Sequence, residues 1–376
     1  MGSASSKQRS ASSLKNSTNK NNNLKETLNK EATVEQTPSA NQQPVTMAAN
    51  KQAEEPTACP HLPALARTPG GTLTQQPLPA EAEVEGYETA HNLYNILNDG
   101  FRQPFLHVPE YILLLDTREP SKYNASRILT ARPQSAIETD FDCSLESGML
   151  KKFTHIVVYD ERSTVSETGS AVSSLASRLR AQELDPVILI GGFDGFQSAY
   201  PFLCNNKNIR SERDRAREIR CYPSEVLEGA LYQGNAKHAA SRDVIGHLGI
   251  THVLNVTTEC DNAFPADCEY LRLKYTDELR SNMKHRLPAA ADFIAGALRS
   301  GGRVLVHCVE GISRSSTLTL AFLMTYRGWS LADGLVYLRN KRPKARPNRA
   351  FLIQLSDLER ELFGRKISDV DDVYLS

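Results

Sequence analysis

One segment of the sequence combines a nucleophile with groups that bind an oxyanion. The apolar run 304–306 leads into His307 and Cys308, and Arg314 follows six residues later, where helix-forming residues resume. A strand, a tight loop and a helix point successive backbone N–H groups at one spot, and the helix dipole adds to their field. Gly311 permits the close turn, and the planar fork of Arg314 can donate to two phosphoryl oxygens. The same field favours the thiolate of Cys308, which makes it the candidate nucleophile.

The alternative interpretation of Cys308 is a buried core thiol beside an ordinary turn. The complete pattern His-Cys-x5-Arg-Ser is much more specific than a cysteine after an apolar strand, and it disfavours that alternative. The segment HCVEGISRS, residues 307–315, resembles the phosphate-binding loop of protein tyrosine phosphatases as it occurs in dual-specificity phosphatases. The resemblance implies phosphoryl transfer to Cys308, hydrolysis of the phosphocysteine by water, and a reaction with no metal and no cofactor.

The resemblance also implies roles for the residues around the nucleophile. His307 matches the position that supports the thiolate. Ser315 matches a hydroxyl that assists breakdown of the phosphocysteine, and a helix N-terminal cap is its alternative role. Asn348, in the run RPNRAF, matches an asparagine that braces the loop. Binding of the substrate phosphate is expected from the loop residues Val309, Glu310, Gly311, Ile312, Ser313 and Arg314.

The leaving oxygen of a phosphorylated side chain needs a proton, so a general acid should lie on a loop that faces the cradle. Asp277 follows a predicted strand upstream of Cys308, where the resembling family has its acid. A helix cap or a surface carboxylate is the alternative, and Asp267 and Glu278 are weaker candidates for the acid.

Two absences point to the substrate class. The short stretch between Arg220 and Cys308 has no room for the part that builds the deep phosphotyrosine slot of classical tyrosine phosphatases. We therefore expect a shallow pocket that admits phosphoserine, phosphothreonine and phosphotyrosine of proteins. The loop contains Glu310 and no lysine, which disfavours a phosphoinositide. The basic run 341–349 could attract phosphopeptides or act as a nuclear signal, with a solvated basic loop as the alternative.

The elements around the loop predict a second α/β domain over residues 220–364. Short apolar runs predict strands near 231–232, 252–256, 270–273 and 303–307. Helical spacing of apolar residues predicts helices over 241–248, 288–299, 315–326, 331–339 and 351–363. A short acidic tail, 365–376, follows.

Upstream, the runs YILLLD and HIVVYD are short and apolar, as buried parallel strands are, and a helical pattern, 167–180, follows them. They predict a first α/β domain over 88–205, joined to the second by a charged linker, 206–219. Segments 113–131 and 188–201 resemble the beginning and end of a rhodanese or Cdc25-type domain. Active members carry a cysteine after the central strand, where this chain has Asp160. Because an aspartate cannot carry a persulfide, the domain is expected to be inactive and sulfur transfer is disfavoured.

An inactive rhodanese-like domain before a dual-specificity domain is the layout of MAP kinase phosphatases. The stretches LYNILN and YILLLDTRE resemble more closely the serine/threonine/tyrosine-interacting-like proteins. Kinase-docking domains of this type carry an arginine cluster, whereas this chain has only Arg127 and Arg132, well separated. This argues against MAP kinase docking, although kinases stay among the expected partners. The leading hypothesis is an active protein phosphatase, and the alternative is a phosphoprotein-binding scaffold with little turnover.

Residues 1–87 are poor in aromatic side chains and rich in Ser, Asn, Thr, Gln, Ala and Pro, so we expect a disordered tail. The start MGSASSKQRS fits the N-myristoylation pattern at Gly2, and six basic residues stand against one acidic residue through Lys30. A fatty chain with nearby basic residues favours a membrane surface, which predicts a cytoplasmic and partly membrane-associated protein. A chance glycine or a mitochondrial presequence is the alternative for the tail, and a nuclear location is the alternative that the basic run would support.

Composition excludes several classes of protein. Lys+Arg and Asp+Glu both number 44, which excludes a globally basic nucleic-acid binder. No stretch approaches the roughly 20 apolar residues that a membrane helix needs. Seven cysteines without paired CxxC spacing argue against a disulfide framework and against a zinc site.

Overall fold

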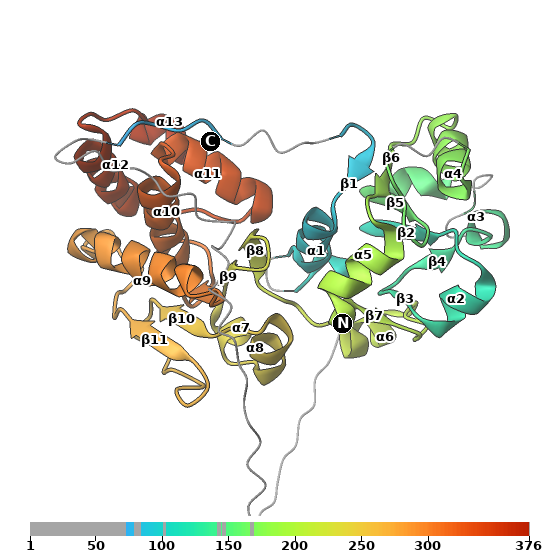
Figure 1. Cartoon of the computed structure of the whole chain (residues 1–376), viewed down its shortest axis with the longest axis horizontal. Coiled ribbons are helices and arrows are strands. Elements are labelled where there is room, and N and C mark those ends of the chain that lie inside the picture. The colour runs from blue at the N-terminus through green and yellow to red at the C-terminus, as the bar shows by residue number, and fades with distance from the viewer. Residues whose placement is uncertain are drawn as a thin grey trace, which may run out of the picture. The chain divides into compact units, whose positions relative to one another are not determined.

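The computed structural model describes residues 73–78, 84–100, 103–140, 144, 148–165 and 169–375, and these residues form two α/β domains in succession (Figure 1). Gly2 and the basic residues near it lie outside the described residues. Within these ranges, none of the helices has the length and apolar character needed to cross a bilayer.

The first domain is built on a five-stranded parallel sheet. The strand order is β1-β6-β5-β2-β4, with β1 Tyr87–Glu88, β6 Pro186–Leu189, β5 His155–Tyr159, β2 Ile112–Asp116 and β4 Arg132–Pro133. The central strands β2 and β5 are the apolar runs noted in the sequence, and they are buried along almost their whole length. A separate antiparallel pair joins β3 Arg127–Ile128 to β7 Cys204–Asn205.

Helices cover both faces of this sheet, because alternate side chains of a strand point to opposite faces. Leu114 of β2 packs in the cluster that contains Leu93 of α1 Ala90–Asn98 and Phe196 of α5 Gly192–Ala199. Its neighbour Leu115 packs in the cluster that contains Ile137 of α3 and Leu175 of α4. The remaining helices of this half are α2 Pro120–Ala125, α3 Ala136–Thr139, α4 Ala171–Arg180 and α6 Glu212–Glu218.

The second domain contains another five-stranded sheet, which is mostly parallel. Its order is β11-β10-β12-β9-β8, and only the β8–β9 pair is antiparallel. The strands are β8 Ser224–Leu227, β9 Leu231–Gly234, β10 His252–Asn255, β11 Glu269–Arg272 and β12 Val304–His307. The strand that leads to Cys308 is therefore the central one, between β10 and β9.

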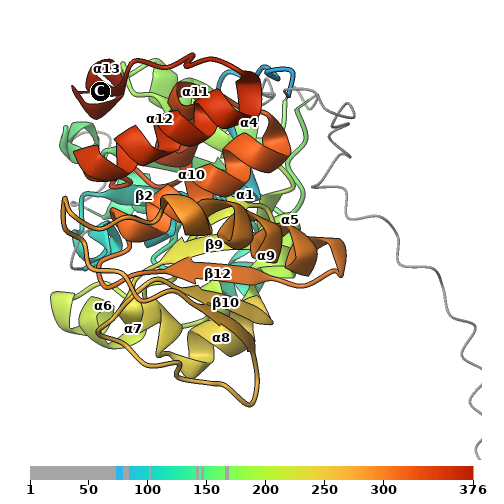
Figure 2. The ribbon, with the colours of Figure 1, turned by 90° about the vertical axis from the view of Figure 1, so that its left-hand side faces the viewer.

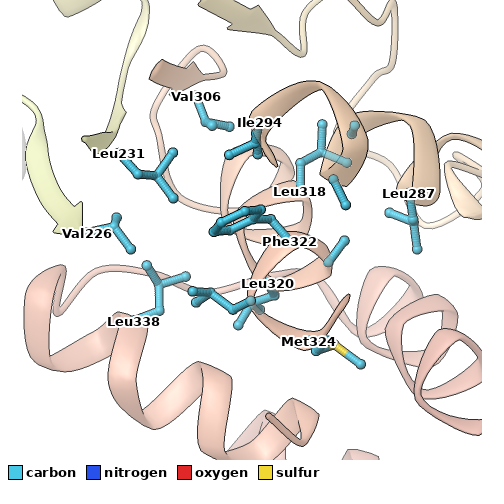
Figure 3. Packing of buried hydrophobic residues seen from close by; sticks show 14 of the residues in the cluster. Val226, Leu231, Leu287, Ile294, Val306, Leu318, Leu320, Phe322, Met324 and Leu338 are labelled. Atoms are coloured by element: carbon cyan, nitrogen blue, oxygen red, sulfur yellow. The ribbon is translucent and has the colours of Figure 1, made fainter. Parts of the chain in front are cut away.

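Figure 2 shows helices on both sides of this sheet, with α9 and α10 on one side and α7 and α8 on the other. The thicker layer packs around Phe322 of α10, whose side chain is fully buried among side chains from strands and helices, including Leu231, Ile294 and Leu320 (Figure 3). The helices are α7 Ala236–Ala239, α8 Arg242–Leu248, α9 Leu287–Arg299, α10 Arg314–Arg327, α11 Leu331–Lys341, α12 Arg349–Phe363 and α13 Val370–Leu375.

A single hydrophobic cluster continues from the first domain into the second. It contains Tyr94 and Tyr200 from the first half of the chain and Tyr222 and Tyr232 from the second. Phe202 stacks on His247, with ring centroids 5.0 Å apart. The two domains therefore share part of their core.

Two segments differ from the sequence prediction. Residues 73–78 fall in the range predicted to be disordered, yet Leu73 N donates to Leu362 O at 2.7 Å and Gln76 N donates to Gly328 O at 2.8 Å. The predicted acidic tail contains α13, where Val373 is buried and Asp371 pairs with Arg349 at 2.7 Å. Both segments add apolar side chains to the core of the second domain, and neither shows the strong periodicity that would reveal it in the sequence.

Candidate active site

The loop after β12 has its carbonyl groups bonded to the surrounding protein. Val309 O accepts from Ala236 N at 3.1 Å, and Ile312 O accepts from Arg346 N at 2.9 Å. Gly311 O accepts from Arg342 Nε at 2.8 Å and from Gln233 Nε2 at 3.3 Å. With these carbonyls held outward, the N–H groups of the loop are left for the concave side, where a tetrahedral oxyanion binds.

Cys308 lies at the bottom of this loop and is almost fully buried. Gly311 N donates to its Sγ at 3.1 Å, and the Ser315 hydroxyl lies 3.4 Å from the same sulfur. Both groups can donate to a thiolate. The structure thus brings Ser315, in the first turn of α10, to the sulfur that the sequence assigns as nucleophile. A sulfur with these donors can attack phosphorus and later leave as a thiolate.

Gly311 is required by its backbone and by its surroundings. Its φ is +70°, a conformation that residues with a Cβ rarely adopt. An added Cβ would clash with Gly234 O and with Nη2 of Arg342. The Arg342 side chain is 2% exposed, and its Nε donates to the Gly311 carbonyl. The loop therefore packs directly against this side chain.

Arg314 is buried and fixed along one edge of its guanidinium. Nη1 donates to Glu259 Oε2 at 3.0 Å, to Glu259 Oε1 at 3.2 Å and to Tyr275 O at 2.8 Å. Among the described residues, Nε has no hydrogen-bond partner. The fixed edge thus leaves the Nε side to receive phosphoryl oxygens. Sequence reasoning missed Glu259, whose only signal is its place just after β10, at the carboxyl end of the parallel strands.

The pKa of Glu259 reflects this contact. Burial works to raise it, but the hydrogen bond and the charge of Arg314 outweigh burial and hold the pKa at about 2. Glu259 is therefore a carboxylate at any pH at which the protein would be assayed, and its pairing with Arg314 persists there.

Asp277, the predicted general acid, lies beside the loop. Its Oδ1 accepts from the Ser313 hydroxyl at 2.6 Å and from Asn348 Nδ2 at 2.9 Å. Its Oδ2 lies 3.9 Å from Arg314 Nε. Because Oδ1 already has two donors, Oδ2 is the oxygen available to carry a proton toward a leaving group.

Asn348, predicted to brace the loop, contacts it through the backbone as well. Asn348 N donates to the Ser313 hydroxyl at 3.1 Å, and Asn348 Oδ1 accepts from Phe351 N at 3.0 Å as the N-cap of α12. One residue therefore joins the phosphate-binding loop, the acid and a helix start. The other two carboxylates weighed as the acid are less suited to the role. Asp267 pairs with Arg242 at 3.2 Å, whereas the exposure of Glu278 does not distinguish it from Asp277, which is exposed too and is favoured by its contacts with Ser313 and Asn348.

His307 is buried beneath the site. Burial lowers its pKa to about 4, although its contact with the Cys308 backbone acts to raise it. Arg314 lowers it further. The ring is neutral at neutral pH, so any support that it gives to the thiolate comes from contact with the backbone and not from a positive charge.

Comparisons with known proteins agree with this geometry. The model of the dual specificity phosphatase catalytic domain matches residues 231–361, and that of the rhodanese-like domain matches residues 89–199. Dual specificity protein phosphatase 4 of Homo sapiens is 30% identical over 296 residues, which cover 70% of this chain and 73% of that protein. The chain belongs to the dual specificity phosphatase family.

Two further relatives share parts of the chain. A protein named "Probable rhodanese domain-containing dual specificity protein phosphatase", of Dictyostelium discoideum, is 35% identical over 49% of this chain and 39% of its own length. Dual specificity protein phosphatase 4 of Rattus norvegicus is 31% identical over 60% of this chain and 62% of its own length. The chain thus spans less than two thirds of these two relatives. The predicted two-domain resemblance is confirmed.

In this dual specificity phosphatase, the first part of the basic run 341–349 is built into the fold. Lys341 and Arg342 are buried, and Lys344 Nζ donates to Gly100 O. Arg349 pairs with Asp371. Arg346 and Arg349 are exposed, so the run is solvated only in part, and its attraction for phosphopeptides or its use as a nuclear signal stays a prediction. The sequence shows the charges of the run but not their long-range partners.

The first domain of this family member has Asp160 directly after β5, where an active rhodanese carries cysteine. Asp160 Oδ1 accepts from Ser163 Oγ at 2.6 Å and from Arg162 N at 3.0 Å, so the carboxylate organises its own turn. Arg127 donates to Lys207 O at 2.8 Å, and Arg132 pairs with Asp140 at 2.8 Å. Both arginines considered for kinase docking are thus engaged in internal contacts.

Proposed function

We propose that this protein hydrolyses phosphoserine, phosphothreonine and phosphotyrosine of proteins through a phosphocysteine. The main support is the buried Cys308 Sγ, which accepts a hydrogen bond from Gly311 N at 3.1 Å. It lies inside a loop that also positions Arg314 and Asp277. This constellation supplies a nucleophile, an oxyanion site and an acid around one phosphoryl group.

The first step uses the thiolate. Cys308 Sγ attacks phosphorus, the bond to the serine, threonine or tyrosine oxygen breaks, and that oxygen takes a proton from Asp277 Oδ2. The N–H groups of the loop and the Nε side of Arg314 hold the equatorial oxygens, where charge lies in the transition state.

The second step releases phosphate. Asp277, now a carboxylate, accepts a proton from the attacking water, whose oxygen bonds to phosphorus as the S–P bond breaks. The Ser315 hydroxyl, 3.4 Å from the sulfur, donates to the departing thiolate. No step, as written, requires a metal.

Membrane association is a separate proposal that the sequence alone supports. If translation begins at the printed Met1, Gly2 would carry a myristoyl group, and Lys7, Arg9 and Lys15 would add roughly 1 kcal/mol each near an anionic surface. Mass spectrometry of the mature N-terminus decides this proposal. A fatty-acylated Gly2 supports it, and an acetylated Gly2 contradicts it.

The test of the proposed function is turnover of para-nitrophenyl phosphate and of phosphopeptides by wild type and by Cys308→Ser. A serine hydroxyl keeps its proton at neutral pH, so the variant should lose turnover while it keeps its fold and still binds phosphopeptide. Comparable turnover by both proteins would contradict the nucleophile. Phosphopeptide binding by a wild type that does not turn over would favour the scaffold alternative.

A further inference from the structure

The first domain completes the edge of the second domain's sheet. Strand β8 is an edge strand, which leaves one row of its backbone groups unpaired within the sheet. Side chains of α1 bond to backbone groups of Glu225 in this strand and of Pro223, the residue before it. Tyr94 Oη donates to Pro223 O at 2.9 Å, Asn95 Nδ2 donates to Glu225 O at 3.0 Å, and Glu225 N donates to Asn95 Oδ1 at 2.8 Å.

A buried carboxylate ties the domains together at the same strand. Glu225 is 1% exposed, and its Oε1 accepts from Tyr232 Oη at 2.8 Å and from Gly229 N at 2.8 Å. Its Oε2 accepts from Tyr200 Oη, which belongs to the first domain. A buried carboxylate is costly unless hydrogen bonds satisfy it, so the contact with Tyr200 favours the joined domains.

Ser224, which lies between Pro223 and Glu225, connects β8 to the phosphate-binding loop through Arg342. Ser224 Oγ accepts from Arg342 Nη1 at 2.9 Å, and Arg342 Nε donates to Gly311 O at 2.8 Å. One guanidinium therefore joins the strand that α1 holds to the loop that holds Cys308.

The backbone on either side of Arg342 is also attached to the first domain. Lys341 Nζ donates to Asn92 Oδ1 at 2.8 Å, and Lys344 Nζ donates to Gly100 O. Helix α1 therefore holds β8, which contains Ser224, the partner of Arg342. Asn92 of α1 and Gly100, which follows α1, also hold segment 341–344, which contains Arg342 itself.

We propose that the rhodanese-like domain, which has Asp160 where active rhodaneses carry cysteine, is a structural part of the phosphatase site, and that Arg342 is the positioning residue through which it acts. Contacts of α1 with β8 and with segment 341–344 fix the position of the Arg342 side chain. Arg342 in turn fixes the position of the Gly311 carbonyl and of the backbone N–H groups beside it. The expected effect on turnover rests on the proposed phosphatase function, whereas the expected effect on oxyanion binding does not.

The experiment compares five full-length proteins. These are wild type, Asn95→Ala, Arg342→Lys, the double variant and the control Gln197→Ala, chosen because Gln197 bonds to Ser126 inside the first domain. Tungstate, a tetrahedral oxyanion, is titrated by calorimetry, and kcat and KM are measured with para-nitrophenyl phosphate. Thermal melting confirms that each variant is folded. Arg342→Lys keeps a cation and is preferred to Arg342→Ala, which removes a fully buried side chain.

We expect Asn95→Ala and Arg342→Lys each to weaken tungstate binding and to lower kcat/KM by about tenfold, because small displacements of a catalytic geometry are costly. The double variant should be no worse than the more affected single variant, since both act through one link. Gln197→Ala should match wild type.

A folded Asn95→Ala protein with tungstate affinity within about twofold of wild type would overturn the inference, as would losses that multiply in the double variant. A wild type that binds tungstate but turns over no phosphate ester would contradict the proposed function alone. The tungstate affinities of the variants would still decide the inference.

Discussion

Arg314 donates from Nη1 to both carboxylate oxygens of Glu259, at 3.0 and 3.2 Å, so one edge of its guanidinium is fixed. The Tyr275 carbonyl occupies the same nitrogen at 2.8 Å. The side chain is therefore oriented before a substrate arrives, and little reorganisation is needed when charge develops on the phosphoryl oxygens.

Replacement of Glu259 by glutamine should lower kcat/KM for para-nitrophenyl phosphate by roughly tenfold, because the amide keeps the size of the side chain but loses the charge-assisted pair. The wild-type pKa of about 2 lies below the ordinary value near 4.5, so the pair is complete above pH 4.5 and is lost as the pH falls toward 2. Between pH 5 and 8, the pH profiles of wild type and Glu259→Gln should have one shape and differ only in height. A change of shape would mean that Glu259 itself titrates in the reaction.

Replacement of Asp277 by alanine should slow phosphoserine peptides more than para-nitrophenyl phosphate. The proton donor matters most where the leaving oxygen is most basic, and a serine alkoxide is far more basic than a nitrophenolate. General acids contribute about 10²–10⁴-fold, so a loss in this range on phosphoserine is expected. Equal losses on both substrates would move the acid role to another group.

Asn348→Ser separates the two roles of the asparagine. Serine is a good N-cap and can still accept from Phe351 N, but it lacks the Nδ2 donor that holds Asp277 Oδ1. We expect melting within a few degrees of wild type and a lower kcat on phosphoserine, with a smaller effect on para-nitrophenyl phosphate. A variant that loses stability but keeps the substrate ratio of wild type would show that Asn348 acts only as a cap.

The local pattern of the sequence was sufficient for most of the fold. The runs that became β2, β5 and β12 are apolar and short, and their burial follows from that pattern. The helix predicted over 315–326 is α10, Arg314–Arg327. Cys308 and Arg314 could be selected because their roles depend on spacing within a single loop, which the chain order preserves.

The contacts that the sequence did not reveal are long-range. Glu259 precedes Arg314 by 55 residues, and Ser224 lies 118 residues before Arg342. In a single sequence, Glu259 is an ordinary carboxylate and Arg342 is one member of a basic run. Only the parallel sheet, which brings the carboxyl ends of β10 and β12 to one edge, places Glu259 beside the loop.

The last prediction concerns stability and pH at His307. Its folded pKa of about 4 lies below the ordinary 6.5, because burial disfavours the charged ring. As the pH falls from 6.5 toward 4, the unfolded chain binds a proton that the folded protein does not, so the free energy of unfolding decreases. A shift of about 2.5 units corresponds to on the order of 3 kcal/mol.

His307→Asn removes this titration, so the slope of unfolding free energy against pH should become shallower between pH 6.5 and 4, whatever the absolute stability of the variant. Urea denaturation at half-unit steps of pH measures the slope. The buried His238, whose pKa is lowered mainly by burial and in smaller part by nearby charges that include His307, stays in both proteins. His285→Asn, at an exposed position, is the matched control and should keep the wild-type slope. If His307→Asn and wild type lost stability in parallel over this range, His307 would not be held neutral by burial.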